Sequence, residues 1–196
     1  MRNSEGIHPW KHFKTITKHR NLVMAMCFRI GLYRQGLLHD LSKYSWTEFS
    51  RGCRYFQGNR SPNNYEREKN GFSLSWLHHK GRNKHHYEYW IDYSMQALPG
   101  GMAPVPMPDR YIAEMIMDRI AASKVYMGDK YTDRSPLDYY YRGTDKAPIH
   151  PKTKAKLLYV LEMLAEQGEE KTFQFIKEEL VQHKRCMDWH QLEKAE

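Results

Sequence analysis

Histidine and aspartate residues recur along the chain in settings that suit metal binding. His19 and Asp118 each lie on a stripe of apolar residues with helical spacing, where a buried polar group needs a partner. Between them, His39 is followed directly by Asp40, and two histidine pairs lie in the segment 76–88, WLHHKGRNKHHYE. Imidazole and carboxylate donors without a thiolate suit Mn²⁺, Fe²⁺, Co²⁺, Ni²⁺ or Zn²⁺ better than Mg²⁺. The series therefore predicts a site for one or two divalent transition-metal ions.

Each of these residues also has a simpler explanation. His19 also fits the role of a core histidine whose side chain is hydrogen-bonded to a backbone carbonyl. Asp118 also fits an ion pair with an Arg or Lys of a neighbouring helix. The segment 76–88 fits a basic, anion-binding surface, although the aromatic residues on both sides of it favour partial burial. Spacing does not decide which member of each pair points inward: His78 or His79, and His85 or His86.

Helical periodicity runs through the sequence and supplies the elements that must bring these residues together. A helix is predicted from about residue 12 to 33, its end marked by Gly36, and a second helical piece from 37 to 43. Further helices are expected at 46–56, 65–79, from Lys84 with Asn83 as its cap, 109–126, 136–141, 151–167 and 169–187. Residues 57–64 and the proline-rich stretch 98–108 are expected to be irregular.

The fold class that follows is all-α, because no alternating strand pattern is found. We expect a single helical bundle over residues 1–196, with a metal-binding core at about 12–141 and C-terminal helices at 151–187 packed on it.

Composition limits the class of protein. The chain carries 31 Lys and Arg against 23 Asp and Glu, a formal charge of +8, which favours an anionic partner such as a phosphate, a nucleotide or nucleic acid. The three cysteines, Cys27, Cys53 and Cys186, form no close pair and predict neither a disulfide framework nor a thiolate zinc site. The longest apolar run, residues 22–28, is too short to cross a bilayer, and the first residues lack a secretory signal. We expect a cytoplasmic protein without a membrane partner.

The order of the candidate ligands resembles the HD superfamily of metal-dependent phosphohydrolases. That superfamily uses a histidine, a His-Asp pair, often further histidines and a distant aspartate, all on a helical bundle. The segments HDLSK and HHKGRNKHH are also similar to a smaller bacterial family of uncharacterised proteins that is sometimes labelled catalase, although no haem-ligand context accompanies them here. One departure from the better-known dinuclear members is that the two middle histidine pairs are close together in the sequence.

The resemblance assigns roles to individual residues. It implies that one ion is held by His19, His39, Asp40 and Asp118, and that a second ion, bridged to the first through Asp40, is held by His79 and His86. His78 and His85 are alternative ligands or phosphate contacts, and four cations near the ligands in sequence are candidates for binding phosphate: Lys43, Lys80, Arg82 and Lys84. Glu114, one turn before Asp118, is expected to orient a ligand histidine or to transfer a proton, and an ion pair with Lys or Arg explains it equally well. The candidate catalytic residues are Asp40, Lys43 and Glu114.

The expected function is hydrolysis of a small phosphorylated molecule, with nucleotides among the candidates, by a metal-activated hydroxide. Two other functions fit parts of the same evidence. The ligand set also resembles that of HD-type di-iron oxygenases. A basic, aromatic-rich chain could instead be a nucleic-acid-binding module without enzymatic activity, although no standard nucleic-acid motif is found.

Overall fold

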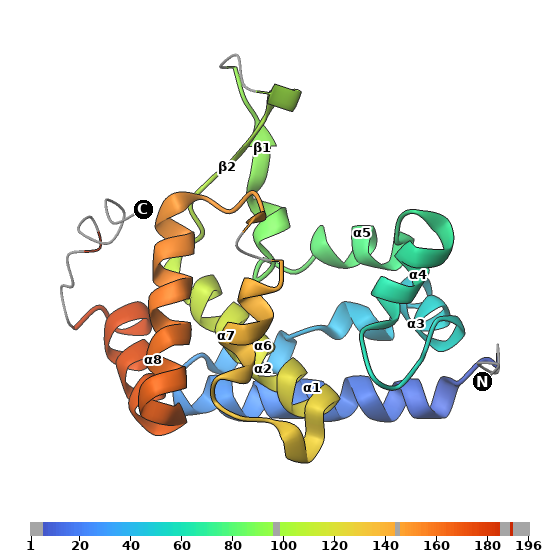
Figure 1. The fold of residues 1–196 in the computed structure, drawn as a ribbon, viewed down its shortest axis with the longest axis horizontal. Helices are drawn as coiled ribbons and strands as arrows, with labels where there is room; N and C mark the ends of the chain where they lie inside the picture. The colour runs from blue at the N-terminus through green and yellow to red at the C-terminus, as the bar shows by residue number, and fades with distance from the viewer. Residues whose placement is uncertain (1–5, 96–98, 144–145, 185–188, 190–196) are drawn as a thin grey trace.

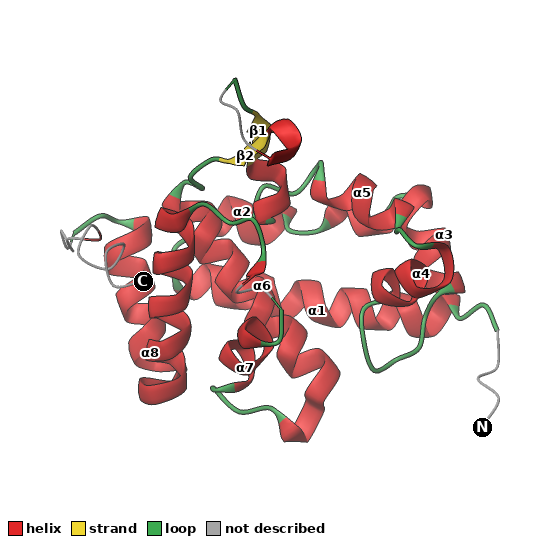
Figure 2. Cartoon of the chain, turned by 45° about the horizontal axis from the view of Figure 1, so that its top comes forward, coloured by secondary structure: helices red, strands yellow, loops and turns green. Residues whose placement is uncertain are grey.

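Helices form nearly all of the regular structure. The computed structural model describes residues 6–95, 99–143, 146–184 and 189. The α-helices within these residues are α1 (Pro9–Arg29), α2 (Tyr33–Leu38), α3 (Trp46–Arg54), α4 (Pro62–Asn70), α5 (Leu74–Lys80), α6 (Asp109–Met127), α7 (Ser135–Tyr141) and α8 (Pro151–Ile176). Short 3₁₀ turns and one π-helical turn join or extend them: η1 (Leu41–Tyr44), η2 (Tyr87–Trp90), η3 (Pro99–Gly101), η4 (Gly128–Lys130) and η6 (Lys177–Val181). The fold is all-α, as predicted (Figure 2).

The core is built where α1, α6 and α8 pack together. Each of these helices turns a run of apolar side chains inward at helical spacing. The fully buried members include Val23 and Cys27 of α1, Ile112, Ile116 and Ile120 of α6, and Leu157, Leu161 and Leu164 of α8. Burial of each such side chain contributes about 1.5–3 kcal/mol, which holds α1 and α6 as a rigid frame. The C-terminal helices pack on this frame.

Two long helices set the shape of the molecule. α1 runs along one side, with α3 and α4 beside its N-terminal half and α8 beside its C-terminal end (Figure 1). An ion pair of 2.6 Å between Arg29 Nη2 and Glu170 Oε2 joins that end of α1 to α8. No helix in the described part of the chain combines the length and the apolarity needed to cross a bilayer.

The first helix ends earlier than predicted. It was expected to continue to residue 33 and to end at Gly36, but α1 ends at Arg29, because Gly31 adopts the left-handed region with φ 87° and turns the chain. Gly36 lies inside α2, where a Cβ atom would come within 2.9 Å of Cys27 Cβ. This glycine therefore allows close packing of α2 on α1 and does not end a helix.

Other predicted boundaries differ for local reasons. The helix expected at 65–79 is divided into α4 and α5 by Gly71, which has φ 79°. No regular helix begins at Lys84, and Asn83 is not a helix cap: its side-chain amide donates to Ser42 Oγ (2.9 Å) and to the carbonyl of His79 (2.8 Å). The proline-rich stretch contains a strand, β2 (Met102–Pro104), which pairs antiparallel with β1 (Ile91–Tyr93). Strands of three residues are too short to show a recognisable alternation.

The C-terminal part follows the prediction until near its end. Gly168, with φ 78° and ψ 173°, interrupts α8 and separates the two predicted helices. The second was expected to reach Met187, but its π-helical turn ends at Val181. Met187 and Cys186 lie outside the described residues.

A close contact between α1 and α3 gives a first prediction. A Cβ atom on Gly52 would lie 2.1 Å from His12 Nε2, and the His12 ring is buried against Phe49 and Phe56. We expect Gly52→Ala to lower the free energy of unfolding by about 1–3 kcal/mol, measured by urea denaturation.

The matched control is Gly81→Ala, because Gly81 has a right-handed φ of −73° and a Cβ there would meet its nearest neighbour at 3.5 Å. This substitution should leave stability unchanged or raise it by about 0.4–1 kcal/mol. An equal decrease in the free energy of unfolding for the two variants would contradict the close packing of His12 on Gly52.

Candidate metal centre

A turn with a left-handed residue brings the side chains of His39 and Asp40 close together. The sequence suggested that the pair lies on a helix, but α2 ends at Leu38 and the two residues form the turn before η1. His39 has an extended ψ of 126°, and Asp40 adopts the left-handed conformation with φ 55° and ψ 22°. A non-glycine residue in this region costs energy and is most often found where function requires it. The turn lets neighbouring side chains enter the same buried space.

The first group of candidate ligands joins α1, this turn and α6. His19 Nε2 lies 2.9 Å from Asp118 Oδ1 and 3.5 Å from Asp40 Oδ2. His39 Nε2 lies 3.3 Å from Asp40 Oδ2 and 3.6 Å from Asp118 Oδ1. One donor atom from each of the four residues falls within 4.8 Å of the others. The residues that the resemblance assigned to one ion are therefore neighbours in space.

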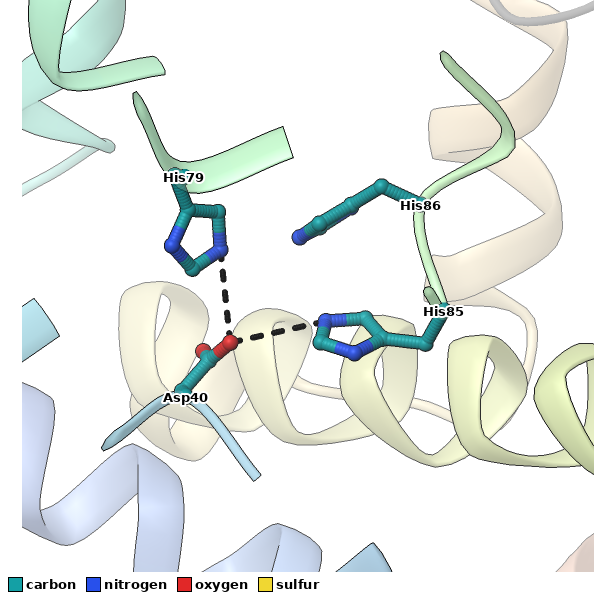
Figure 3. A group of neighbouring side chains, drawn as sticks. All are labelled: Asp40, His79, His85 and His86. Carbon is teal, nitrogen blue, oxygen red and sulfur yellow. Dashed lines mark ion pairs between the residues drawn. The ribbon is translucent and has the colours of Figure 1, made fainter. Parts of the chain in front are cut away.

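The second group gathers around the other carboxylate oxygen of Asp40, and Figure 3 shows its members. Asp40 Oδ1 is 3.3 Å from His79 Nε2 and 3.5 Å from His85 Nε2, and His86 completes the group. His79 and His86, which the resemblance assigned to a second ion, are therefore neighbours of Asp40 in space. His85, which was considered as an alternative ligand or a phosphate contact, is in the same group; His79 and His85 are buried, and His86 is half-buried.

Asp40 is the residue that the two groups share. One carboxylate oxygen faces the first group and the other faces the second. Its side chain is 1% exposed, and Oδ1 has no hydrogen bond among the described residues. Burial alone would raise the pKa of this carboxyl group, but the neighbouring His39, Lys43 and His79 outweigh burial and hold the pKa well below its usual range. Asp40 is therefore an anion with an oxygen available to each group.

The tautomers of the histidines also suit metal binding. Glu114 Oε1 lies 2.9 Å from His39 Nδ1 and 3.1 Å from His85 Nδ1. A carboxylate only accepts hydrogen bonds, so each ring donates from Nδ1 and presents a bare Nε2 when neutral. The Nε2 atoms of both rings are buried and have no hydrogen bond of normal geometry within the described chain. Glu114 therefore lies on the Nδ1 side of both rings and can fix their orientation.

Glu48 supports the second group in the same way and was missed by the sequence analysis. Its Oε2 accepts from His79 Nδ1 and its Oε1 from His78 Nδ1, both at 2.7 Å. Burial alone would raise the pKa of Glu48, but its hydrogen bonds to the two imidazoles lower it. An acidic residue in the first turn of a helix is common for electrostatic reasons, so nothing in the sequence singled out this one.

The candidate phosphate-binding residues are spread around the centre. Lys43 reaches it directly, because its Nζ lies 2.5 Å from Asp40 Oδ2 while its side chain is 27% exposed. His78 points to Glu48 and is not in either ligand group. Lys80, Arg82 and Lys84 lie on α5 and the following turn, and within the described residues none of them forms an ion pair with the carboxylates of the centre. Of the four candidate cations, Lys43 is therefore the one that the structure places beside Asp40.

The donor set fits divalent transition metals. Two clusters of imidazole nitrogens and carboxylate oxygens, each buried apart from one half-buried member, could each hold a metal ion, with Asp40 able to serve both. Buried carboxylates are costly unless a cation or hydrogen bonds compensate them, and a bound divalent ion would provide that compensation.

Comparison with known proteins gives a family but no activity. The chain matches the model of DUF5662, described as a family of unknown function, over residues 8–163. The matched region contains all the candidate ligands. No curated protein matches the chain, and no solved structure does.

The two groups predict a pattern of metal loss. Asp40→Ala should remove both ions, since both groups use this residue, whereas Asp118→Ala should remove only the first and His86→Ala only the second. The measurement is metal content per chain by mass spectrometry after loading with Mn²⁺ or Zn²⁺ and gel filtration.

His183→Ala is the control, because this side chain is 66% exposed and lies outside both groups. Circular dichroism should confirm that each variant is folded. Full metal content in Asp40→Ala would contradict the shared site.

The supporting carboxylates predict a second pattern. Glu48 contacts a ligand of the second group alone, whereas Glu114 contacts one ring from each group. Glu48→Gln should lower the affinity for the second ion about 10–100-fold and leave the affinity for the first ion unchanged. Glu114→Gln should lower the affinity for both ions. Competition with a chelating dye measures the two affinities, and a uniform effect of Glu48→Gln on both ions would contradict this assignment.

Proposed function

This chain belongs to the DUF5662 family, whose function is unknown, and we propose that it is a metal-dependent phosphohydrolase acting on a small phosphorylated molecule. The observation that carries the proposal is the position of Asp40, with one oxygen toward His19 and His39 and the other toward His79 and His85. A shared carboxylate can hold two ions close together, as in many enzymes that hydrolyse phosphate esters.

The candidate ligands would form two metal sites, and two glutamates would orient the imidazoles. The first ion would be held by His19, His39, Asp40 and Asp118, and the second by Asp40, His79, His85 and His86. Such ions lower the pKa of water toward neutrality and polarise a phosphoryl oxygen. Glu114 and Glu48 fix the orientation of the imidazoles by accepting from Nδ1.

Lys43 is the residue that would bind the phosphate group. Its ammonium group lies beside Asp40 at the partly exposed side of an otherwise buried centre. Although burial alone would lower its pKa, Asp40 and Asp118 keep the group protonated. A positive charge fixed beside the reacting phosphorus would stabilise the negative charge that develops on the phosphoryl oxygens. The net charge of +8 supports an anionic substrate in general.

The test is hydrolysis by metal-reconstituted protein. We expect protein loaded with Mn²⁺, Co²⁺ or Zn²⁺ to hydrolyse p-nitrophenyl phosphate, bis-p-nitrophenyl phosphate or members of a nucleotide panel, and chelation to abolish the activity. Lys43→Met should lower kcat by about 10²–10³-fold without loss of metal. Asp40→Asn and Asp118→Asn should lose both metal and activity.

Lys18→Met is a matched control, since Lys18 is an exposed lysine of α1. Full activity in Asp118→Asn would refute the proposal. So would an iron-loaded protein that consumes oxygen and hydrolyses none of these esters, because that result identifies a di-iron oxygenase.

A further inference from the structure

A cavity lies at the N-terminal end of α1, beside α3 and α4, and none of the candidate metal ligands lines it. Its volume is about 990 Å³. Three segments line it: residues 6–11 around the start of α1, residues 54–60 at and after the end of α3, and one side of α4. The wall on α1 includes Lys11, eight residues before the candidate ligand His19. This separation corresponds to about 12 Å along the helix axis, so the cavity is a distinct site.

The lining is strongly basic. It contains His8, Lys11, Arg54, Arg60 and Lys69, and no carboxylate is among the described residues that line it. Arg60 is already paired with Glu68, at 2.5 and 2.6 Å. Lys11 and Arg54 form no ion pair with any described residue, and both are exposed. Two cations that have no carboxylate partner among the described residues and that line one concave space attract an anion.

The same cavity also offers aromatic and amide groups. Tyr55, Phe56 and Tyr65 contribute rings, and Gln57, Asn59 and Asn70 contribute side-chain amides. The faces of Tyr65 are near Arg60 and Lys69, whose charged groups lie 5.9 and 5.4 Å from its ring centre. A flat heteroaromatic ring can stack on Tyr55 or Phe56, and amides can bond the edge of such a ring. Inorganic phosphate alone would use none of these groups.

The size of the cavity favours a small ligand. Sites for small molecules and cofactors usually measure about 300–1,000 Å³ and combine apolar or aromatic walls with a few polar groups. A nucleic-acid strand would instead need a basic groove that continues along its backbone. The cavity is bounded by segments that gather at one end of the molecule (Figure 1).

We propose that this cavity binds a nucleotide, with its phosphates at Lys11 and Arg54 and its base against Tyr55 and Phe56, independently of the metal centre. The proposal does not depend on the phosphohydrolase activity. A nucleotide bound here would be a ligand at a separate site and not the group that is cleaved.

The experiment measures ATP binding by isothermal titration calorimetry in EDTA, so that no divalent ion is present. The double variant Lys11→Gln/Arg54→Gln should bind at least about tenfold more weakly than the unmodified protein, because two charge-assisted contacts are lost. The matched control Lys18→Gln/Arg34→Gln removes the same charge from exposed positions outside the cavity. Its affinity for ATP should stay within about twofold of that of the unmodified protein. Asp40→Asn should bind normally, which separates this site from the metal centre.

A second comparison tests the base. ATP should bind at least about fivefold more tightly than tripolyphosphate, and Tyr55→Leu should reduce that preference, because base stacking adds affinity that phosphates lack. Equal binding of the two probes would overturn the proposal in favour of a general anion site. Tighter binding of a single-stranded oligonucleotide than of ATP, or equal weakening by the matched control, would overturn it as well.

Discussion

The architecture of the candidate site depends on the burial of one carboxylate. Asp40 is almost completely withdrawn from solvent, and its charge is acceptable only because imidazoles and Lys43 surround it. Burial of an uncompensated ion costs several kcal/mol, a large part of the stability of a domain. α1, α6 and the segments after α2 and α5 must therefore bring their polar residues to the same place. The apolar packing of α1 on α6 supplies the rigidity for this arrangement.

The sequence could predict a buried position for polar residues that lie on long periodic helices. His19 and Asp118 interrupt apolar stripes of α1 and α6, and such an interruption indicates a buried polar residue whatever the rest of the fold. The helices themselves were predictable for the same reason, since α6 and the two halves of α8 have strong periodicity with glycine or proline at their boundaries.

Residues in short turns could not be placed in this way. Whether His85 or His86 points inward depends on the path of the chain after Gly81, where the expected helix is replaced by turns held by Asn83. The division of Asp40 between two groups depends on a left-handed backbone conformation that its neighbours in sequence do not require. Glu48 could not be predicted as a supporting residue, because its role comes from a contact with His79 that joins α3 to α5. A single sequence does not reveal contacts between helices.

Glu114 has a consequence for how the two ligand groups behave together. Its Oε1 atom lies beside one ring of each group, and Asp40 supplies an oxygen to each. Ions bound to the two groups would therefore share two anionic partners. Any effect of one ion on the affinity for the other would be reciprocal, because thermodynamic linkage requires each to influence the other by the same factor.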